Sequence, residues 1–238
     1  MLLQSIDLSD LVIIFISQLI LASIFLFIAI KLLKRTRPRP IITLSILYFL
    51  LIAGFIFNII HVIIRTIHPE NVLLLEVIYF LTFYPLLFAP IFLLTFIISI
   101  LKLGDVFTLK KQLIITLIYG FVTLLIFFIP DGITFTEQWQ PIYSWAFFAA
   151  IYTSFTIFIT IPTIWYSRRL VRTFQDNILK KKLITFLIGV FAMYSVIYGA
   201  VLYLTWQNPL FRTIWSVVTF FLMIPSGILI YLGIGREL

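Results

Sequence analysis

The chain has 238 residues, of which 63% are hydrophobic and only 11% are charged. A water-soluble domain of this composition would have too little polar surface to cover itself, so the ordinary soluble classes are excluded. The formal net charge is +8, but the basic residues flank apolar runs. We therefore exclude nucleic acid as a partner and expect the chain to lie in a lipid bilayer.

Seven apolar runs are long enough to cross the roughly 30 Å hydrocarbon core as helices. Their continuous, non-alternating pattern favours helices over the strands of a barrel. The first run is too long, and the segment before it too acidic, for a cleaved signal peptide. The sequence predicts an all-α integral membrane protein, one seven-helix bundle over residues 1–238, with spans at about 11–30, 41–66, 72–101, 112–130, 143–166, 183–205 and 211–234.

Basic residues are distributed very unevenly between the two sides of these spans. One side has only Arg65 and Arg212. The other side has Lys31, Lys34, Arg35, Arg37, Arg39, Lys102, Lys110, Lys111, Arg168, Arg169, Arg172, Lys180, Lys181, Lys182 and Arg236. Most carboxylates lie with the two arginines: Asp7, Asp10, Glu70, Glu76, Asp131 and Glu137. Because basic loops stay in the cytoplasm, we expect the N-terminus outside and the C-terminus inside.

A polar stripe lies within the second run. Gly54, Asn58, His61 and Arg65 follow the spacing of one helix face. Ionisable residues are rare inside a membrane span, so a polar partner or a water-filled cavity is expected beside them. His61 is either a neutral, hydrogen-bonded core residue or a sensor of pH or ligand.

The depth of these residues predicts a ligand site in the outer half of the bundle. Gln18 of the first run should lie at a depth similar to that of the polar stripe, and aromatic residues of later runs could line the same cavity, although an interfacial aromatic belt explains them as well. The predicted ligand-binding residues are Gln18, Asn58, His61, Tyr84, Tyr198 and Trp215.

Three arrangements are open for Arg65. It could extend to the membrane surface, form a structural ion pair with Glu76 across the short turn, or contact a ligand. Of these, the ion pair is the one that makes a definite structural prediction.

The longest linker carries Arg168, Arg169 and Arg172. It either sets the topology or forms a docking surface for a cytoplasmic signalling protein or for lipid headgroups. The fifth apolar run, which directly precedes this linker, carries hydroxyl side chains at helical spacing. They indicate a seam for helix packing or, as the minor alternative, a transport path. The third run contains Pro85 and Pro90 and is expected to bend.

Catalytic patterns are missing from the sequence. There is no zinc-protease motif, no phosphate-binding loop and no acidic cluster for Mg²⁺. The absence of cysteine excludes thiol chemistry. We therefore expect a protein that is not an enzyme and that has no cofactor and no bound metal.

Two stretches resemble a known family. The third run has Phe-Ala-Pro at 88–90 and continues to Phe96, and the sixth run is entered through three lysines at 180–182 and reaches Gly189. They resemble the N-terminal seven-transmembrane input domain of prokaryotic sensor histidine kinases, over the third to sixth spans. The resemblance implies sensing by the bundle and output to a cytoplasmic domain. No kinase precedes Leu238, so we expect a stand-alone module or the input half of a longer protein.

The leading interpretation is a sensor or receptor-like module of a prokaryotic cell membrane, alone or as a homo-oligomer. It would bind a small or lipophilic signal in the outer half of the bundle and signal to a cytoplasmic partner. The alternatives are a small-solute transporter and a structural subunit of a membrane complex.

Overall fold

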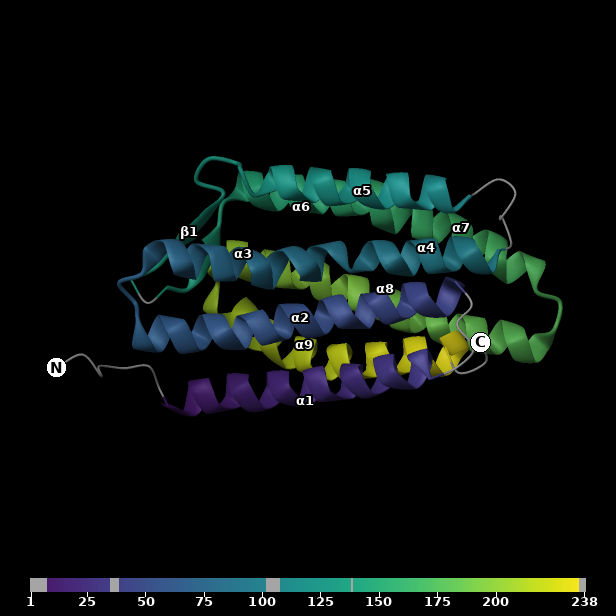
Figure 1. The fold of residues 1–238 in the computed structure, drawn as a ribbon, viewed down its shortest axis with the longest axis horizontal. Helices are drawn as coiled ribbons and strands as arrows, with labels where there is room; N and C mark the ends of the chain where they lie inside the picture. The colour runs from purple at the N-terminus through teal and green to yellow at the C-terminus, as the bar shows by residue number, and fades with distance from the viewer. Residues whose placement is uncertain (1–7, 35–38, 102–107, 138, 236–238) are drawn as a thin grey trace.

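The computed structural model describes residues 8–34, 39–101, 108–137 and 139–235, and within these ranges the side chains of 8–14, 220, 234 and 235 are not described. Asp7, Arg35, Arg37, Lys102 and Arg236, which contributed to the predicted orientation, lie outside the described residues, as does the side chain of Asp10. In the described chain, seven helical segments are long and apolar enough to cross a membrane. They lie side by side along the long axis (Figure 1), as predicted for a helical bundle.

The elements follow one another in a simple order. They are α1 (Leu8–Leu33), α2 (Arg39–Ile67), α3 (Val72–Phe88), α4 (Pro90–Ile100), α5 (Leu109–Ile126), β1 (Ile133–Phe135), β2 (Pro141–Tyr143), α6 (Trp145–Phe155), the π-helix η2 (Thr156–Thr160), α7 (Ile161–Thr173), α8 (Asn177–Thr205), α9 (Pro209–Ile230) and the π-helix η3 (Tyr231–Gly235). The third span consists of α3 and α4, and the fifth of α6, η2 and α7.

Polar side chains define where several helices begin. Asn71, Ser144, Asp176 and Asn208 each precede a helix and accept a hydrogen bond from a backbone N–H of its first turn. The cap at Asp176 starts α8 at Asn177, whereas the apolar pattern predicts a start at 183. The difference arises because a capped helix continues through polar residues outside the apolar run.

The fourth span ends at Ile126, four residues before the predicted limit of 130. The chain then turns and forms a short antiparallel hairpin, in which Ile133 pairs with Tyr143. The sequence reading did not predict this hairpin. The buried hydroxyls of Tyr143 and Tyr79 share a hydrogen bond, which ties the hairpin to α3.

Proline shapes both the third and the fifth spans. Pro90 starts α4 after a one-residue interruption at Ala89, so the third span is divided where a bend was expected. In the fifth span Pro162 follows η2. Proline has no N–H to donate to the preceding turn, and beside it the N–H of Ile161 bonds to the carbonyl of Thr156, five residues back. The π-helix is thus a local widening next to Pro162.

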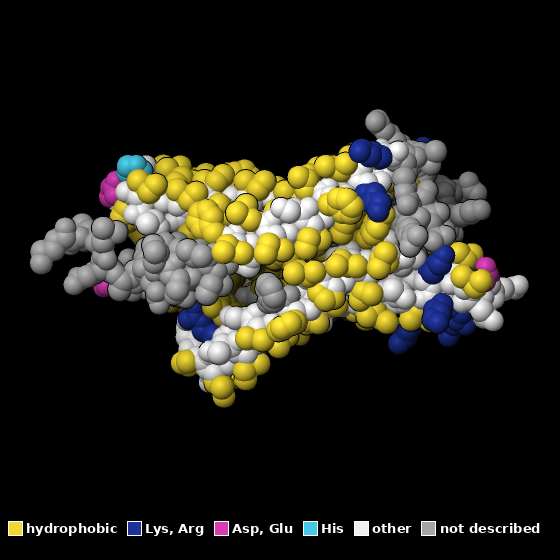
Figure 2. Space-filling model, turned by 90° about the horizontal axis from the view of Figure 1, so that it is seen from below, with side chains coloured by type: hydrophobic (Ala, Val, Ile, Leu, Met, Phe, Trp, Pro, Cys, Tyr) yellow, Lys and Arg dark blue, Asp and Glu magenta, His cyan; other side chains and the backbone are white. Residues whose placement is uncertain are grey.

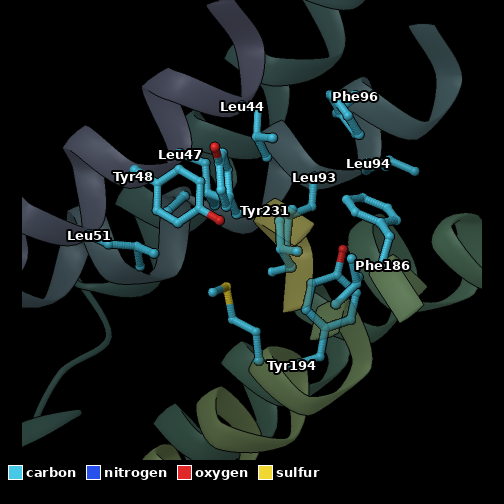
Figure 3. Packing of buried hydrophobic residues seen from close by; sticks show 14 of the residues in the cluster. Leu44, Leu47, Tyr48, Leu51, Leu93, Leu94, Phe96, Phe186, Tyr194 and Tyr231 are labelled. Carbon is cyan, nitrogen blue, oxygen red and sulfur yellow. The ribbon is translucent and has the colours of Figure 1, made fainter. Parts of the chain in front are cut away.

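Glycines allow α9 and η3 to pack closely on the bundle. A methyl group at Gly227 would overlap the ring of Phe25 of α1, and one at Gly189 would overlap the backbone of α9. The hydroxyl of Tyr48 of α2 donates to the carbonyl of Gly227 at 2.8 Å. Figure 3 shows this region, where Tyr48 and Tyr231 meet side chains of α4 and α8. The helices therefore converge tightly in this half of the bundle.

Charged side chains are separated along the long axis. In Figure 2, most Lys and Arg side chains lie toward one end, while histidine and most acidic side chains lie at the other. We call these the basic end and the acidic end. The ends are those predicted from the sequence, and the bundle between them is covered by apolar residues such as Phe27, Phe121 and Phe221.

Candidate functional site

A cavity of about 600 Å³ lies between α1, α2, α3, α8 and α9. Its walls are mainly apolar and include Gln18, Phe55, Phe83, Met193, Ala200 and Phe221. We call it the bundle pocket. Its volume falls within the range of pockets that enclose small molecules. Figure 2, which faces the side of α1 and α9, shows the surface hollowed between these helices.

The bundle pocket exists because the helices converge at one level and separate at another. Around Gly227, α1 and α2 contact α9 through Phe25 and Tyr48. On the acidic-end side of this contact, the wall of the pocket is formed by Leu51 and Phe55 of α2 and by residues of α9 that precede Met223. The pocket thus extends from the middle of the bundle toward the acidic end and stops at the contact around Gly227.

One polar atom in the bundle pocket has an unmet hydrogen-bonding capacity. The side-chain oxygen Oε1 of Gln18 is buried and has no hydrogen-bond partner among the described residues. Across the pocket, the hydroxyl of Ser216 is already engaged, because it donates to the carbonyl of Arg212 at 2.9 Å. A buried acceptor without a partner is costly. A donor group on a bound molecule would relieve that cost.

Of the six predicted ligand-binding residues, only Gln18 lines the bundle pocket. Tyr84 points toward α5, where its hydroxyl donates to the carbonyl of Gly120. Tyr198 faces the fifth span and bonds the hydroxyls of Thr156 and Thr160 at 2.7 and 2.8 Å. These two tyrosines make packing contacts and do not line the bundle pocket, so a role for them in ligand binding stays a prediction.

Trp215 also lies outside the lining of the bundle pocket. Its indole packs against Gly199 of α8 so closely that a methyl group there would overlap it. The ring stacks on Phe211 with centroids 6.0 Å apart. Its Nε1 is buried and has no partner in the described chain.

The polar stripe of α2 is placed differently from the predicted cavity. His61 is buried, and its ring lies 5.5 Å from that of Tyr79 of α3. Its Nε2 has no hydrogen-bond partner among the described residues. Asn58 is half-buried. Neither residue lines the bundle pocket, so His61 belongs to the contact between α2 and α3.

The predicted ion pair between Arg65 and Glu76 is not formed. Within the described chain, Glu70 and not Glu76 contacts a basic side chain, through its Oε1 at 3.1 Å from Nδ1 of His68. Glu76 is exposed and lines a groove with Phe80 of α3 and residues of α5 and the hairpin. Arg65 is half-buried, and its Nε has no partner among the described residues. Glu76 thus lies beside the groove between α3, α5 and the hairpin.

A second hollow lies at the basic end. Trp165, Arg168, Arg169, Arg172 and Thr173 of α7 line an open surface hollow of about 460 Å³. The predicted linker therefore continues the helix as far as Thr173. The three arginines predicted to act together do lie together, and all three are exposed.

The sequence reading did not find most residues of the bundle pocket. They are ordinary apolar residues such as Met193, Val196 and Phe221, which do not differ in type from residues that face lipid. The one usable signal was a glutamine in an apolar run. In the described chain, no group of three or more His, Cys, Asp or Glu side chains is arranged to hold a metal ion.

Comparisons with models of protein families, with curated proteins and with solved structures found no match for this chain. The resemblance to the input domains of sensor kinases therefore stays a prediction.

Proposed function

We propose that the chain is a membrane-embedded, receptor-like module that binds a lipophilic molecule in the bundle pocket. The observation that carries this proposal is the pocket itself, an apolar cavity of about 600 Å³ formed by five helices. The unpartnered Oε1 of Gln18 favours a ligand with a hydroxyl or amide N–H at one end. A long-chain alcohol has this chemistry.

The uneven distribution of basic residues supports an orientation with the basic end in the cytoplasm. In this orientation the bundle pocket extends from the membrane centre into the outer half. The hollow between α1 and α9 would admit the ligand sideways from the lipid (Figure 2). A lipophilic ligand would then partition into the bilayer first and need not cross water.

The contact around Gly227 supports a route for a signal. Pro225 lies inside α9 and close to this contact, and proline weakens the local helix. A ligand that changes the separation of α1 and α9 in the outer half would move α9 about the point where Phe25 and Tyr48 hold it. The movement would reach the basic end, where we propose that a cytoplasmic partner responds.

A photoreactive hexadecanol, carrying a diazirine on its chain, tests the proposal. In the purified full chain, we expect labelling of α1 and α9 that is saturable by unlabelled hexadecanol. Ala200→Trp fills the pocket, and it should lower this labelling about tenfold or more because the bound chain loses apolar contacts. Ala149→Trp is the matched control, since Ala149 is exposed on α6. Labelling that is not saturable, or that falls equally in both variants, would refute the proposal.

A second variant tests the polar end of the pocket. Gln18→Leu removes the unpartnered acceptor and keeps the volume similar. We expect weaker competition by hexadecanol and unchanged competition by hexadecane. Equal loss of both competitors would show that the amide does not recognise a donor group.

Flux measurements separate this function from solute transport. Three threonine hydroxyls of the fifth span are hydrogen-bonded to Tyr194 and Tyr198 of α8, which supports a packing seam there. We expect proteoliposomes to show no uptake above protein-free vesicles for a panel of small sugars and amino acids.

A further inference from the structure

The basic end contains a group of side chains that the bundle pocket does not explain. Trp165, Arg168, Arg169, Arg172 and Thr173 all belong to α7 and line one open hollow on its surface. With about 100° of rotation per residue, their positions fall within roughly 140° of one another around the helix. They therefore form one face of α7, which we call the arginine face.

The arginine face has no internal neutralisation in the described chain. None of its three arginines forms an ion pair with a described carboxylate. The nearest acidic residue along the chain, Asp176, uses its side chain to cap α8, accepting from the N–H of Ile178 at 2.8 Å. The hydroxyl of Thr173 is likewise engaged, with the carbonyl of Arg169. The hollow therefore presents guanidinium groups that are not paired with any carboxylate of the described chain.

The position of Trp165 indicates where this face lies relative to the membrane. Its side chain is 70% exposed, and tryptophan is enriched at the level of lipid headgroups. At about 1.5 Å of rise per residue, Arg168 and Arg169 lie roughly 5–6 Å further along the helix axis. A headgroup layer is roughly 5–7 Å thick on each side of the hydrocarbon core. The arginines thus lie at the depth of lipid phosphates.

We propose that the arginine face binds the phosphate of an anionic phospholipid, with the acyl chains alongside Trp165 and the apolar surface of the fifth span. Guanidinium groups bind phosphate through paired N–H donors, which a lysine cannot reproduce. Trp165 at the edge of the hollow and the exposed Ile157 and Ile161 below it offer an apolar surface for the chains. A soluble protein partner would have no use for this apolar strip. The proposal does not depend on the ligand of the bundle pocket.

Phosphatidylglycerol, with phosphatidylcholine as the zwitterionic reference, provides the test. The purified full chain in detergent is titrated with each lipid, and retained lipids are counted by native mass spectrometry while thermal unfolding is recorded. We expect phosphatidylglycerol to be retained and to raise the unfolding temperature. The triple variant Arg168→Gln, Arg169→Gln, Arg172→Gln should need about tenfold more lipid or more for the same shift.

Two further variants separate a site from diffuse charge. The triple variant Lys110→Gln, Lys180→Gln, Lys181→Gln removes the same charge from exposed positions of the basic end outside the hollow, and it should bind the lipid like the wild type. Replacing the three arginines with lysine keeps the charge and removes the paired donors, so it should bind almost as weakly as the glutamine variant. Because all of these positions are exposed, we expect each variant to fold.

Four results would overturn the proposal. Equal weakening by the lysine-to-glutamine control would show diffuse attraction. Full binding by the arginine-to-lysine variant would show that no guanidinium site exists. An equal shift produced by soluble glycerol phosphate, or protection of the arginines by a co-purifying cytoplasmic protein in place of lipid, would assign the face to another partner.

Discussion

Replacement of Gly227 by alanine tests whether the contact between α9 and α1 is as close as the structure shows. Gly227 lies within α9, where alanine is intrinsically favoured over glycine by about 1 kcal/mol. On helix preference alone, the substitution should stabilise the protein. Packing predicts the opposite, because the new methyl group overlaps the ring of Phe25.

The size of the effect follows from how firmly Phe25 is held. Its ring is fully buried and contacts the rings of Tyr48 and Phe55, with centroids 5.5 and 6.0 Å away. It therefore has no free space into which to turn. Overpacking of this kind costs about 1–3 kcal/mol. After subtraction of the helix preference, we expect a net loss of up to roughly 2 kcal/mol.

Thermal or SDS-induced unfolding of the purified protein measures this loss. A second substitution, at Phe25, tests whether the clash with its ring is the cause. Phe25→Leu removes the part of the ring that the methyl group overlaps, at its own cost in packing. In that background, Gly227→Ala should be neutral or stabilising, so the two substitutions couple by about 1 kcal/mol or more. If Gly227→Ala destabilises both backgrounds equally, the contact with Phe25 is not the cause.

Three other substitutions test separate parts of the structure. Tyr198→Phe removes hydrogen bonds to two threonine hydroxyls of η2 and should lower the unfolding free energy by about 1–2 kcal/mol. The control is Tyr166→Phe, which should cost almost nothing because the hydroxyl of Tyr166 makes no hydrogen bond to another described residue. The pKa of Glu70 is held below the ordinary 4.5, chiefly by a backbone hydrogen bond and then by a hydrogen bond with His68. The ionised carboxylate therefore stabilises the turn after α2 fully above that ordinary value, and this stabilisation is lost as the pH falls through the lowered pKa. Hydrogen exchange in the turn should accelerate in acid in the wild type, but not in the Glu70→Gln variant. Because no ion pair joins Glu76 to Arg65, Glu76→Gln should change the unfolding free energy by less than about 0.5 kcal/mol, and a double-mutant cycle with Arg65→Gln should show no coupling.

The spans could be predicted because a bilayer imposes a length and an apolar composition on every helix that crosses it. The limits of those spans were predicted less well. Asp176 starts α8 before its apolar run begins, and Ile126 ends α5 before its apolar run is over. In both cases local hydrogen bonding, through a cap or a turn, sets the limit, and hydropathy does not report it.

The candidate site was harder to predict because the depth of a residue in the membrane does not determine which neighbouring helix its side chain faces. The position along a helix could be counted from the sequence, but neither the order of neighbouring helices nor the rotation of each helix could. Tyr198 illustrates this: it lies on α8, which lines the bundle pocket, but on the face toward the fifth span. Gln18 was identified because a buried amide is unusual in an apolar run at any rotation.

The hairpin between α5 and α6 was missed for a different reason. Each strand has only three residues, Ile133–Phe135 and Pro141–Tyr143, so the pattern is too short to distinguish from a loop. Its place is fixed by tertiary contacts, chiefly the hydroxyl contact between Tyr79 and Tyr143 and the packing of Tyr143 on Phe147. A strand of this kind is determined by what it packs against.

Helix α8 lines the bundle pocket and also contacts the fifth span, which carries the arginine face. Met193 and Ala200 on one face line the bundle pocket. Tyr194 and Tyr198, roughly a third of a turn away around the helix, bond three threonine hydroxyls of the fifth span, which continues into the arginine face. A ligand that displaces α8 must therefore either break these hydroxyl bonds or move the fifth span with it. Since binding free energies are coupled reciprocally, a lipid held at the arginine face would oppose or favour the ligand to the same extent as the ligand acts on the lipid.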